Sequence, residues 1–210
     1  MPTPNEILAG LMSITNRWFV FAVAWHLLVA AGLIAASQHW RPSPRVSGAL
    51  LVAPLLSVSA FAWGIDDRFN GTVFLALSAV LGFISWHADR VEVPRQKWIT
   101  VLALVLISFA WVYPEFLRGW PQVAYLIAAP MGLVPCPTLA MVLGFTLLGY
   151  GPSSRAWALT LALAASFYAG VGVMRLGVTI DLVLLVGAMG LAVRALGHSR
   201  GAERRLQLVS

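Results

Sequence analysis

Long apolar runs alternate with short polar segments along this chain of 210 residues. In a helix, about 20 apolar residues cross the roughly 30 Å hydrocarbon layer of a bilayer, so runs of this length predict membrane spans. The predicted spans are residues 17–36, 46–63, 72–87, 98–113, 121–150, 156–174 and 178–196. The pattern therefore predicts an all-α polytopic membrane helical bundle of about seven transmembrane helices.

The fifth predicted span is interrupted by proline. It reads PQVAYLIAAPMGLVPCPTLAMVLGFTLLGY, and its internal prolines are Pro130, Pro135 and Pro137. Each interior proline removes a helical hydrogen bond and clashes with the preceding turn. Hydrocarbon offers the released carbonyls no partner, so such a break must be buried against protein or line a polar cavity. We therefore predict a proline-broken fifth helix, with Cys136 near the bilayer centre because it stands almost midway along the span.

Shorter features mark the ends of the spans. Within residues 1–16, the apolar positions Ile7, Leu8, Leu11 and Ile14 recur at helical spacing. They indicate either a short helix on the outer surface of the membrane or a longer first span. Tryptophan prefers the membrane interface, and eight tryptophans fall at or beside a predicted span end: Trp18, Trp40, Trp63, Trp86, Trp98, Trp111, Trp120 and Trp157. Trp25 is internal to its span.

Composition supports the membrane assignment and limits the partners. Hydrophobic residues make up 60% of the chain and charged residues 10%, with a mean hydropathy of +0.83, whereas soluble domains carry about 25% charged residues. The loops between the spans are too short for a soluble domain, so residues 1–210 are predicted to form a single transmembrane domain in the lipid bilayer. The net charge of +6 is spread between and after the spans, which argues against a nucleic-acid partner.

The direction of the fifth segment decides the orientation of the chain. If the segment crosses, one face holds ten cationic residues, namely Arg41, Arg45, Arg90, Arg95, Lys97, Arg155, Arg194, Arg200, Arg204 and Arg205. The other face then holds four, namely Arg17, Arg68, Arg118 and Arg175. A segment that dips in and returns gives six against eight. Because cytoplasmic loops retain Lys and Arg, we predict that it crosses, with the N-terminus outside and the basic tail of residues 197–210 in the cytoplasm.

The single cysteine of the chain excludes an intramolecular disulfide and a CxxC site. The break around Cys136 could line a substrate or ion path, as broken helices do in many transporters. The thiol could instead bind a soft metal such as copper with Met131 and Met141, take part in redox chemistry, or serve as a small buried hydrophobe at a kink. Redox exchange lacks a second thiol and a metal lacks further ligands, while three prolines exceed what a kink requires. The pattern favours the substrate-lining break.

Polar residues near the break complete the candidate site. Glu115 and Asp181 both fall on the predicted outer side, where they could flank the mouth of a polar path or form interfacial salt bridges with Arg118 and Arg175. The candidate substrate- or ion-binding residues are Pro135, Cys136, Pro137, Thr138, Glu115 and Asp181. His26, inside the first span, is predicted to be buried and hydrogen-bonded. The chain has no sequence motif of an enzyme active site and identifies neither a metal nor a cofactor.

A stripe of small residues runs along the sixth span at every fourth position. It consists of Ala158, Ala162, Ser166 and Gly170. Small residues let helix backbones approach closely in membranes, so the stripe predicts a helix-packing surface. Gly187 and Gly190 in the last span are candidates for the facing surface.

Several short marks are spread over about residues 113–191: Tyr113 and Pro114, the run GLVPCPT at residues 132–138, Gly144, and GVTID ending in Asp181. Through these residues the C-terminal part of the chain resembles a family of uncharacterised bacterial integral membrane proteins. The resemblance implies the topology of a bacterial integral membrane protein, expected in the inner membrane, and singles out Cys136, Thr138 and Asp181 without supplying a mechanism. The family pattern is more polar just after the Pro-Cys-Pro-Thr run, where this chain has Leu139 and Ala140, which argues against ion coordination by hydroxyl groups.

Two functions from different classes fit these observations. The first is a small permease or channel-like protein with its pathway or binding site at the broken helix around Cys136. The second is a non-catalytic membrane subunit or assembly factor that packs against a larger membrane complex through the small-residue stripe. Either function is compatible with a homo-oligomer.

Overall fold

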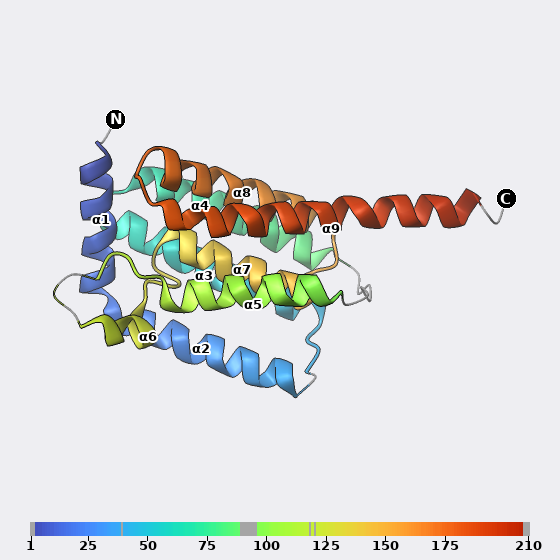
Figure 1. The fold of residues 1–210 in the computed structure, drawn as a ribbon, viewed down its shortest axis with the longest axis horizontal. Helices are drawn as coiled ribbons and strands as arrows, with labels where there is room; N and C mark the ends of the chain where they lie inside the picture. Colours follow the sequence, from blue (N-terminus) through green and yellow to red (C-terminus); the bar gives the residue numbers. More distant parts are fainter. Residues whose placement is uncertain (1–2, 39, 89–95, 118, 120, 208–210) are drawn as a thin grey trace.

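The structure is a computed structural model that describes residues 3–38, 40–88, 96–117, 119 and 121–207, with side chains described to residue 197. All regular elements in these ranges are helices (Figure 1). In chain order they are α1 (Pro4–Arg17), α2 (Phe19–Ser37), α3 (Pro44–Gly64), α4 (Arg68–Trp86), α5 (Lys97–Val112), the 3-10 helix η1 (Gln122–Ala124), α6 (Tyr125–Ala128), α7 (Pro135–Leu147), α8 (Arg155–Met174), the 3-10 helix η2 (Thr179–Asp181) and α9 (Leu182–Gln207).

Within the described part of the chain, five helical segments are long and apolar enough to cross a membrane. They are α2, α3, α4, α8 and the segment Thr179–Gly197 that opens α9. The apolar helices α5 and α7 have 16 and 13 residues, about 24 and 20 Å at the α-helical rise, which is less than the roughly 30 Å hydrocarbon layer. The predicted all-helical fold is therefore confirmed, with five candidate membrane spans, while the count of seven spans and the proline-broken fifth span stay predictions.

The long helices lie side by side, and α1 lies across one end of them (Figure 1). α3 packs along α4, α8 along α9 and α5 along α7. We call the end covered by α1 the α1 end; there α3, α5 and α8 end and α4, α7 and α9 begin. We call the opposite end, beyond which α9 continues, the tail end. Every residue of α7 except Cys136 is buried, so α7 is the central helix.

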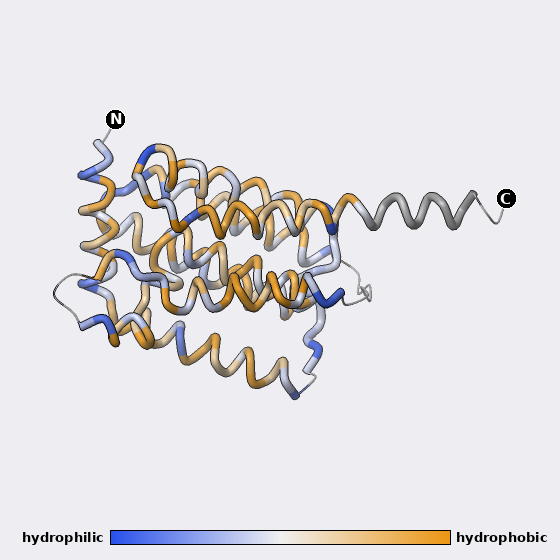
Figure 2. Tube along the Cα trace, in the orientation of Figure 1, coloured by the Kyte–Doolittle hydropathy of each residue, from blue (hydrophilic) through white to orange (hydrophobic). Residues whose placement is uncertain are grey.

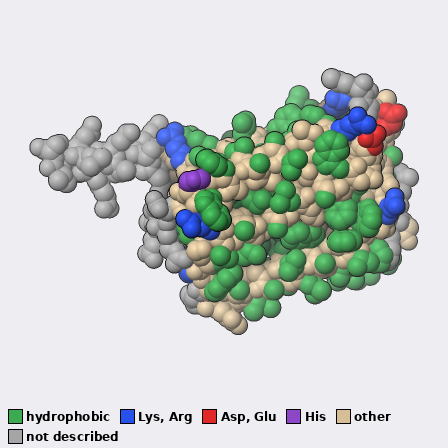
Figure 3. Space-filling model, turned by 180° about the vertical axis from the view of Figure 1, so that it is seen from behind, with side chains coloured by type: hydrophobic (Ala, Val, Ile, Leu, Met, Phe, Trp, Pro, Cys, Tyr) green, Lys and Arg blue, Asp and Glu red, His purple; other side chains and the backbone are tan. Residues whose placement is uncertain are grey.

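The flanks of the bundle are apolar. Figure 2 shows hydrophobic residues along the helices and hydrophilic ones at the turns, and Figure 3 shows charged side chains gathered at the two ends of one face. Large apolar side chains such as Leu27 and Leu163 are 68% and 73% exposed. A monomeric water-soluble protein rarely exposes so large an apolar surface, so this flank suits contact with lipid.

The helix expected within residues 1–16 is separate from the first span. Its N-terminus carries a capping box, in which Thr3 and Glu6 satisfy each other's backbone N–H groups. It ends at Arg17, where Trp18 leaves helical geometry before α2 begins. Its own residues Leu11 and Ile14 are buried. The alternative of one longer first span is therefore wrong.

Two sequence-based expectations about packing need correction. Trp157 is fully buried and donates from Nε1 to the Thr146 hydroxyl at 3.2 Å, so it belongs to the core and not to an interface. Gly187 and Gly190 face Leu106 and Leu102 of α5, whose side chains occupy the space where a Cβ would stand, so they do not face α8. Trp120 lies outside the described residues.

The small-residue stripe of α8 is packed along half of its length. Ala158 and Ala162 are buried, Ser166 is half-buried, and no atom lies within 4 Å of a Cβ placed on Gly170. Each step of four residues turns about 40° further round the helix, so the stripe leaves the buried face. That face continues instead through Ala165, Ala169 and Gly172.

Candidate functional site

Hydrogen bonds made by Thr138 stabilise the break before α7. Residues 129–134 are not helical, and the N–H groups of Leu133 and Val134 both donate to the Pro130 carbonyl at 3.1 Å. The Thr138 hydroxyl donates to the Val134 carbonyl at 2.7 Å and accepts from the Gly132 N–H at 2.9 Å. These bonds satisfy backbone groups that hydrocarbon would leave unpaired. Thr138 therefore has a structural role and its hydroxyl is occupied.

Gly132 lets the break turn sharply against α2. Its φ of +78° lies in the left-handed region that glycine adopts without steric cost. A Cβ at this position would overlap the indole of Trp25, which itself donates from Nε1 to the Ser57 hydroxyl at 3.1 Å. The one tryptophan internal to its predicted span thus packs on the break.

Cys136 lies at the α1 end and not midway through the bundle. It is in the first turn of α7, beside Asp181 of η2 and close to Tyr113, which follows the last residue of α5. The sequence-based position near the bilayer centre assumed a steady helical rise from residue 121. In the structure the helical stretch before the break is only η1 and the four-residue α6, so the chain has advanced little by residue 136.

Asp181 is the centre of a buried polar cluster. The Tyr113 hydroxyl donates to Asp181 Oδ1 at 2.9 Å, and the Cys136 thiol lies close enough to the same carboxylate to interact with it. Asp181 and Tyr113 are 1% and 0% exposed, whereas Cys136 is half-buried. A Cβ on Gly172 of α8 would overlap Asp181 Oδ2, so the glycine makes room for the carboxylate. Three segments far apart in sequence thus converge on one group.

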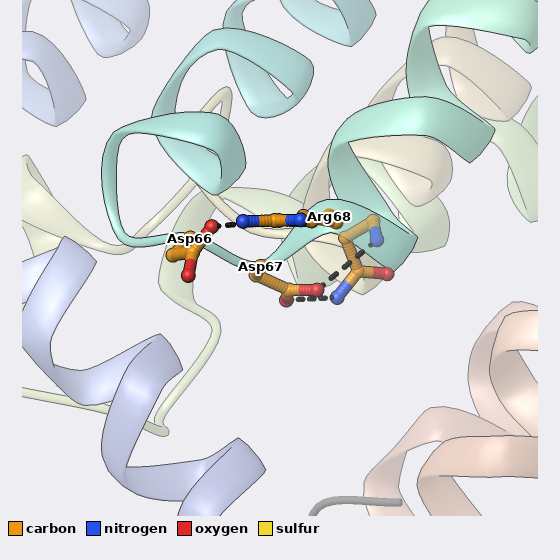
Figure 4. A network of polar contacts seen from close by, with 4 residues as sticks. Asp66, Asp67 and Arg68 are labelled. Carbon is orange, nitrogen blue, oxygen red and sulfur yellow. Dashed lines mark hydrogen bonds and ion pairs between the residues drawn. The ribbon is translucent and has the colours of Figure 1, made fainter.

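A second polar cluster surrounds the turn between α3 and α4. Asp67 caps α4 by accepting from the Asn70 N–H at 3.1 Å, and it also accepts from the Asn70 amide at 2.6 Å. Tyr168 of α8 donates to Asn70 Oδ1 at 2.7 Å, which ties α4 to α8. Asp66 and Arg68 form an exposed ion pair at 2.9 Å, which Figure 4 shows beside Asp67.

A cavity of about 580 Å³ separates the two clusters. One wall comes from α1, and the others come from the α3–α4 turn, the start of α7, the end of α8 and η2. Most of its surface is apolar, and Asp181, Cys136, Tyr113 and Tyr168 supply polar groups to its inner part. Pockets of 300–1,000 Å³ hold small organic ligands, so the volume suits one.

Glu6 of α1 also borders the cavity. Hydrogen bonds from the Thr3 backbone N–H and hydroxyl lower the pKa of Glu6 below its ordinary value. Glu6 is therefore ionised at neutral pH, and α1 brings a negative charge to the cavity.

Three of the six predicted site residues line the cavity, namely Pro135, Cys136 and Asp181. Pro137 and Thr138 are buried in the first turns of α7 and do not line it. Glu115 is half-buried in the loop after α5, close enough to Asp181 to act on it electrostatically, but it is not part of the wall. The cavity also includes Tyr168, Gly172 and the inner face of α1, which the sequence pattern does not identify as parts of a site. The pattern indicates α1 only as an amphipathic helix.

The structure also bears on the hypotheses about His26 and about a soft-metal site at Cys136. His26 is buried, with Nδ1 2.8 Å from the Ala22 carbonyl and Nε2 2.9 Å from the Trp111 carbonyl, as predicted. Met131 and Met141 are buried in the core and do not line the cavity that Cys136 borders. Within the described residues no group of three or more His, Cys, Asp or Glu side chains is arranged to hold a metal ion.

Comparison with protein-family models, curated proteins and solved structures found no match to this chain. The site itself therefore carries the functional argument. Reactive thiolates lie beside cations or a helix N-terminus free of competing charge, whereas Cys136 lies beside a carboxylate. The arrangement suits ligand binding better than nucleophilic catalysis.

Proposed function

We propose that the protein is a small permease or channel-like protein of the bacterial inner membrane that binds its substrate in the cavity at the α1 end. The observation that carries this proposal is the cavity itself, which places the buried Asp181 carboxylate and the Cys136 thiol beside a helix break. Broken helices with bare backbone ends form the substrate sites of many secondary transporters. The marks of the family resemblance, Tyr113, Cys136 and Asp181, come from three different segments and meet in this cavity, which supports its functional role.

The positions of the cations support an orientation with the α1 end outside. The described cations at the tail end are Arg41, Arg45, Lys97, Arg155 and Arg194, and those at the α1 end are Arg17, Arg68 and Arg175. Arg90, Arg95 and Arg118 lie outside the described residues, as do the side chains of Arg200, Arg204 and Arg205. The positive-inside rule then favours a cytoplasmic tail end, with seven crossings in which the fifth comprises η1, α6, the break and α7.

The central helix favours a permease over an open channel. Toward the tail end, every residue of α7 after Cys136 is buried among its neighbours. The cavity therefore opens toward the α1 side, and a substrate could pass only if α7 or its neighbours moved. Non-helical backbone at the break supplies a place where such a movement requires no helical hydrogen bond to be broken.

The experiment uses the native single cysteine as a probe. In oriented membrane vesicles, a membrane-impermeant maleimide should label Cys136 from the α1 side and not from the tail side. Cys136→Ser should abolish labelling, and an added Asp66→Cys in that background should mark the α1 side, because Asp66 is exposed. Complete protection of Cys136 from both sides in native membranes would contradict a substrate cavity.

A second function is favoured by the outer face of α8. Gly170 has open space around it and Ser166 is only half-buried, so a helix of another chain could approach closely there. On this alternative the protein is a non-catalytic subunit or assembly factor of a larger membrane complex, or a homo-oligomer. Gly170→Leu should then release the partner during purification in mild detergent, while Gly170→Ala should not. Recovery of the wild-type protein as a lone monomer would contradict this alternative.

A further inference from the structure

Charge around the cavity is unbalanced in favour of carboxylates. Among the residues that the structure describes, the charged ones that line it are Glu6, Asp66, Asp67 and Asp181 on the acidic side and Arg68 and Arg175 on the basic side. Arg68 is paired with Asp66, and Arg175 is exposed at the end of α8. The deepest charged group is therefore Asp181. Fields in a low-dielectric cleft are stronger than at an open surface, so the interior of the cavity attracts cations.

Asp181 retains capacity to bind a cationic ligand. An ionised carboxylate has about four lone-pair sites for hydrogen bonds, and the Tyr113 hydroxyl provides one donor, with the Cys136 thiol close by. Both groups are neutral, and among the described residues no cationic side chain lies within ion-pair distance of Asp181. A buried carboxylate usually has a cationic partner. A bound ligand could supply that partner.

The remaining wall suits an apolar, polarisable body. The aromatic residues that contribute to it, among those that the structure describes, are Phe69, Tyr113, Phe116, Phe167 and Tyr168. Aromatic faces attract ammonium groups through their quadrupole, and their area also binds hydrocarbon. A hydrated metal ion would find few oxygen ligands on such a wall, and an anion would meet Asp181.

We propose that the substrate is an organic cation, a protonated or quaternary amine with an apolar or aromatic body, whose charged nitrogen approaches Asp181 while its body packs on the aromatic wall. This inference rests on the proposed function, since it names the substrate class of the same cavity. The volume of about 580 Å³ accommodates an amine with a single aromatic ring.

The first test compares two thiol reagents of similar size and opposite charge at Cys136. A trimethylammonium-ethyl methanethiosulfonate should react faster than the sulfonato-ethyl compound by about tenfold or more, after each rate is divided by its rate with a free thiol in solution. In Asp181→Asn the preference should fall toward unity, because the amide keeps the shape and accepts the Tyr113 hydrogen bond without the charge. If that variant does not fold, Glu6→Gln at the rim should reduce the preference in part.

The second test measures protection of Cys136 by a ligand. Phenyltrimethylammonium should slow labelling by a neutral maleimide, whereas tert-butylbenzene, which has nearly the same shape without the charge, should protect at least about tenfold more weakly at equal concentration, and benzenesulfonate should not protect. Protection by the cation should be lost in Asp181→Asn, with the unprotected labelling rate of each variant as its own reference.

The outcomes separate this inference from the proposed function. If Cys136 reacts with neither reagent from either side, the cavity is not accessible and both proposals fail. If Cys136 reacts readily but shows no preference for the cationic reagent, or is protected equally by the neutral ligand, the binding cavity stands and the organic-cation assignment is overturned.

Discussion

At Gly172 of α8 the structure leaves no room for a side chain. A Cβ there would overlap Asp181 Oδ2 and lie 3.0 Å from Asp181 Cγ. Gly172→Ala must therefore displace the carboxylate from the Tyr113 hydroxyl or force α8 away from η2. Gly170, two residues earlier on the same helix, has no atom within 4 Å of its Cβ position and is the matched control.

The magnitude follows from the difference between the two variants. Replacing glycine by alanine inside a helix stabilises it by about 0.5–1 kcal/mol, and this gain applies to both positions. If Asp181 and its neighbours keep their positions, overpacking by the new methyl group costs about 1–3 kcal/mol. If the Asp181 side chain is displaced instead, the loss of its hydrogen bond from Tyr113 costs about 1.5–3 kcal/mol. Gly172→Ala should thus be less stable than Gly170→Ala by about 1–3 kcal/mol on either route.

The assay is reversible unfolding in mixed detergent micelles, followed by tryptophan fluorescence. Labelling of Cys136 should change in Gly172→Ala, because the thiol loses its fixed carboxylate partner, and should match wild type in Gly170→Ala. Equal stability of the two variants with unchanged labelling would refute the placement of Asp181 against Gly172 and with it the geometry of the buried cluster.

Two further predictions concern the break before α7. Gly132→Ala should destabilise the fold more than Gly119→Ala, because both glycines have φ near +77° but a Cβ at residue 132 also overlaps Trp25. Left-handed strain costs both variants about 1–2 kcal/mol, and overpacking adds about 1–3 kcal/mol at residue 132 alone. Unfolding titrations with equal midpoints for the two variants would contradict the contact with Trp25. Thr138→Val should lower the free energy of unfolding by about 1–3 kcal/mol, because it leaves the Gly132 N–H and the Val134 carbonyl unpaired. Thr138→Ser keeps the hydroxyl and should stay within about 1 kcal/mol of wild type. A valine variant as stable as the serine variant would show that the hydroxyl does not stabilise the break.

The helices were largely predictable because their limits are set by local chemistry. Residues 156–174 were expected as one span, and α8 covers Arg155–Met174. Its N-terminus is fixed by the Ser154 hydroxyl, which accepts from the Trp157 N–H, and α3 begins in the same way after Ser43. Such caps and apolar runs act within a few residues, so the sequence displays them directly.

The depth of the site was not predictable by the same means. The position of Cys136 depends on how far residues 121–134 advance along the bundle, and that distance is set by the contact between Gly132 and Trp25, which are more than a hundred residues apart in sequence. Membership of the site depends likewise on the rotation of α8 about its axis, which brings Tyr168 and Gly172 to the cavity and turns Gly170 away from it. Tertiary packing decides both quantities.

The shortness of α7 connects the fold to the proposed function. With 13 residues it is about 20 Å long, whereas its neighbour α3 has 21 residues and is about 31 Å long. Because α7 reaches the tail end, about the last 10 Å of the bundle at the α1 end has no central helix. The break fills part of that space and α1 covers it, but the side chains around Asp181 do not fill the rest, and the cavity is what remains. Pro135 opens α7 and lies on the cavity wall next to Cys136, so the start of the central helix both borders the cavity and supplies its thiol.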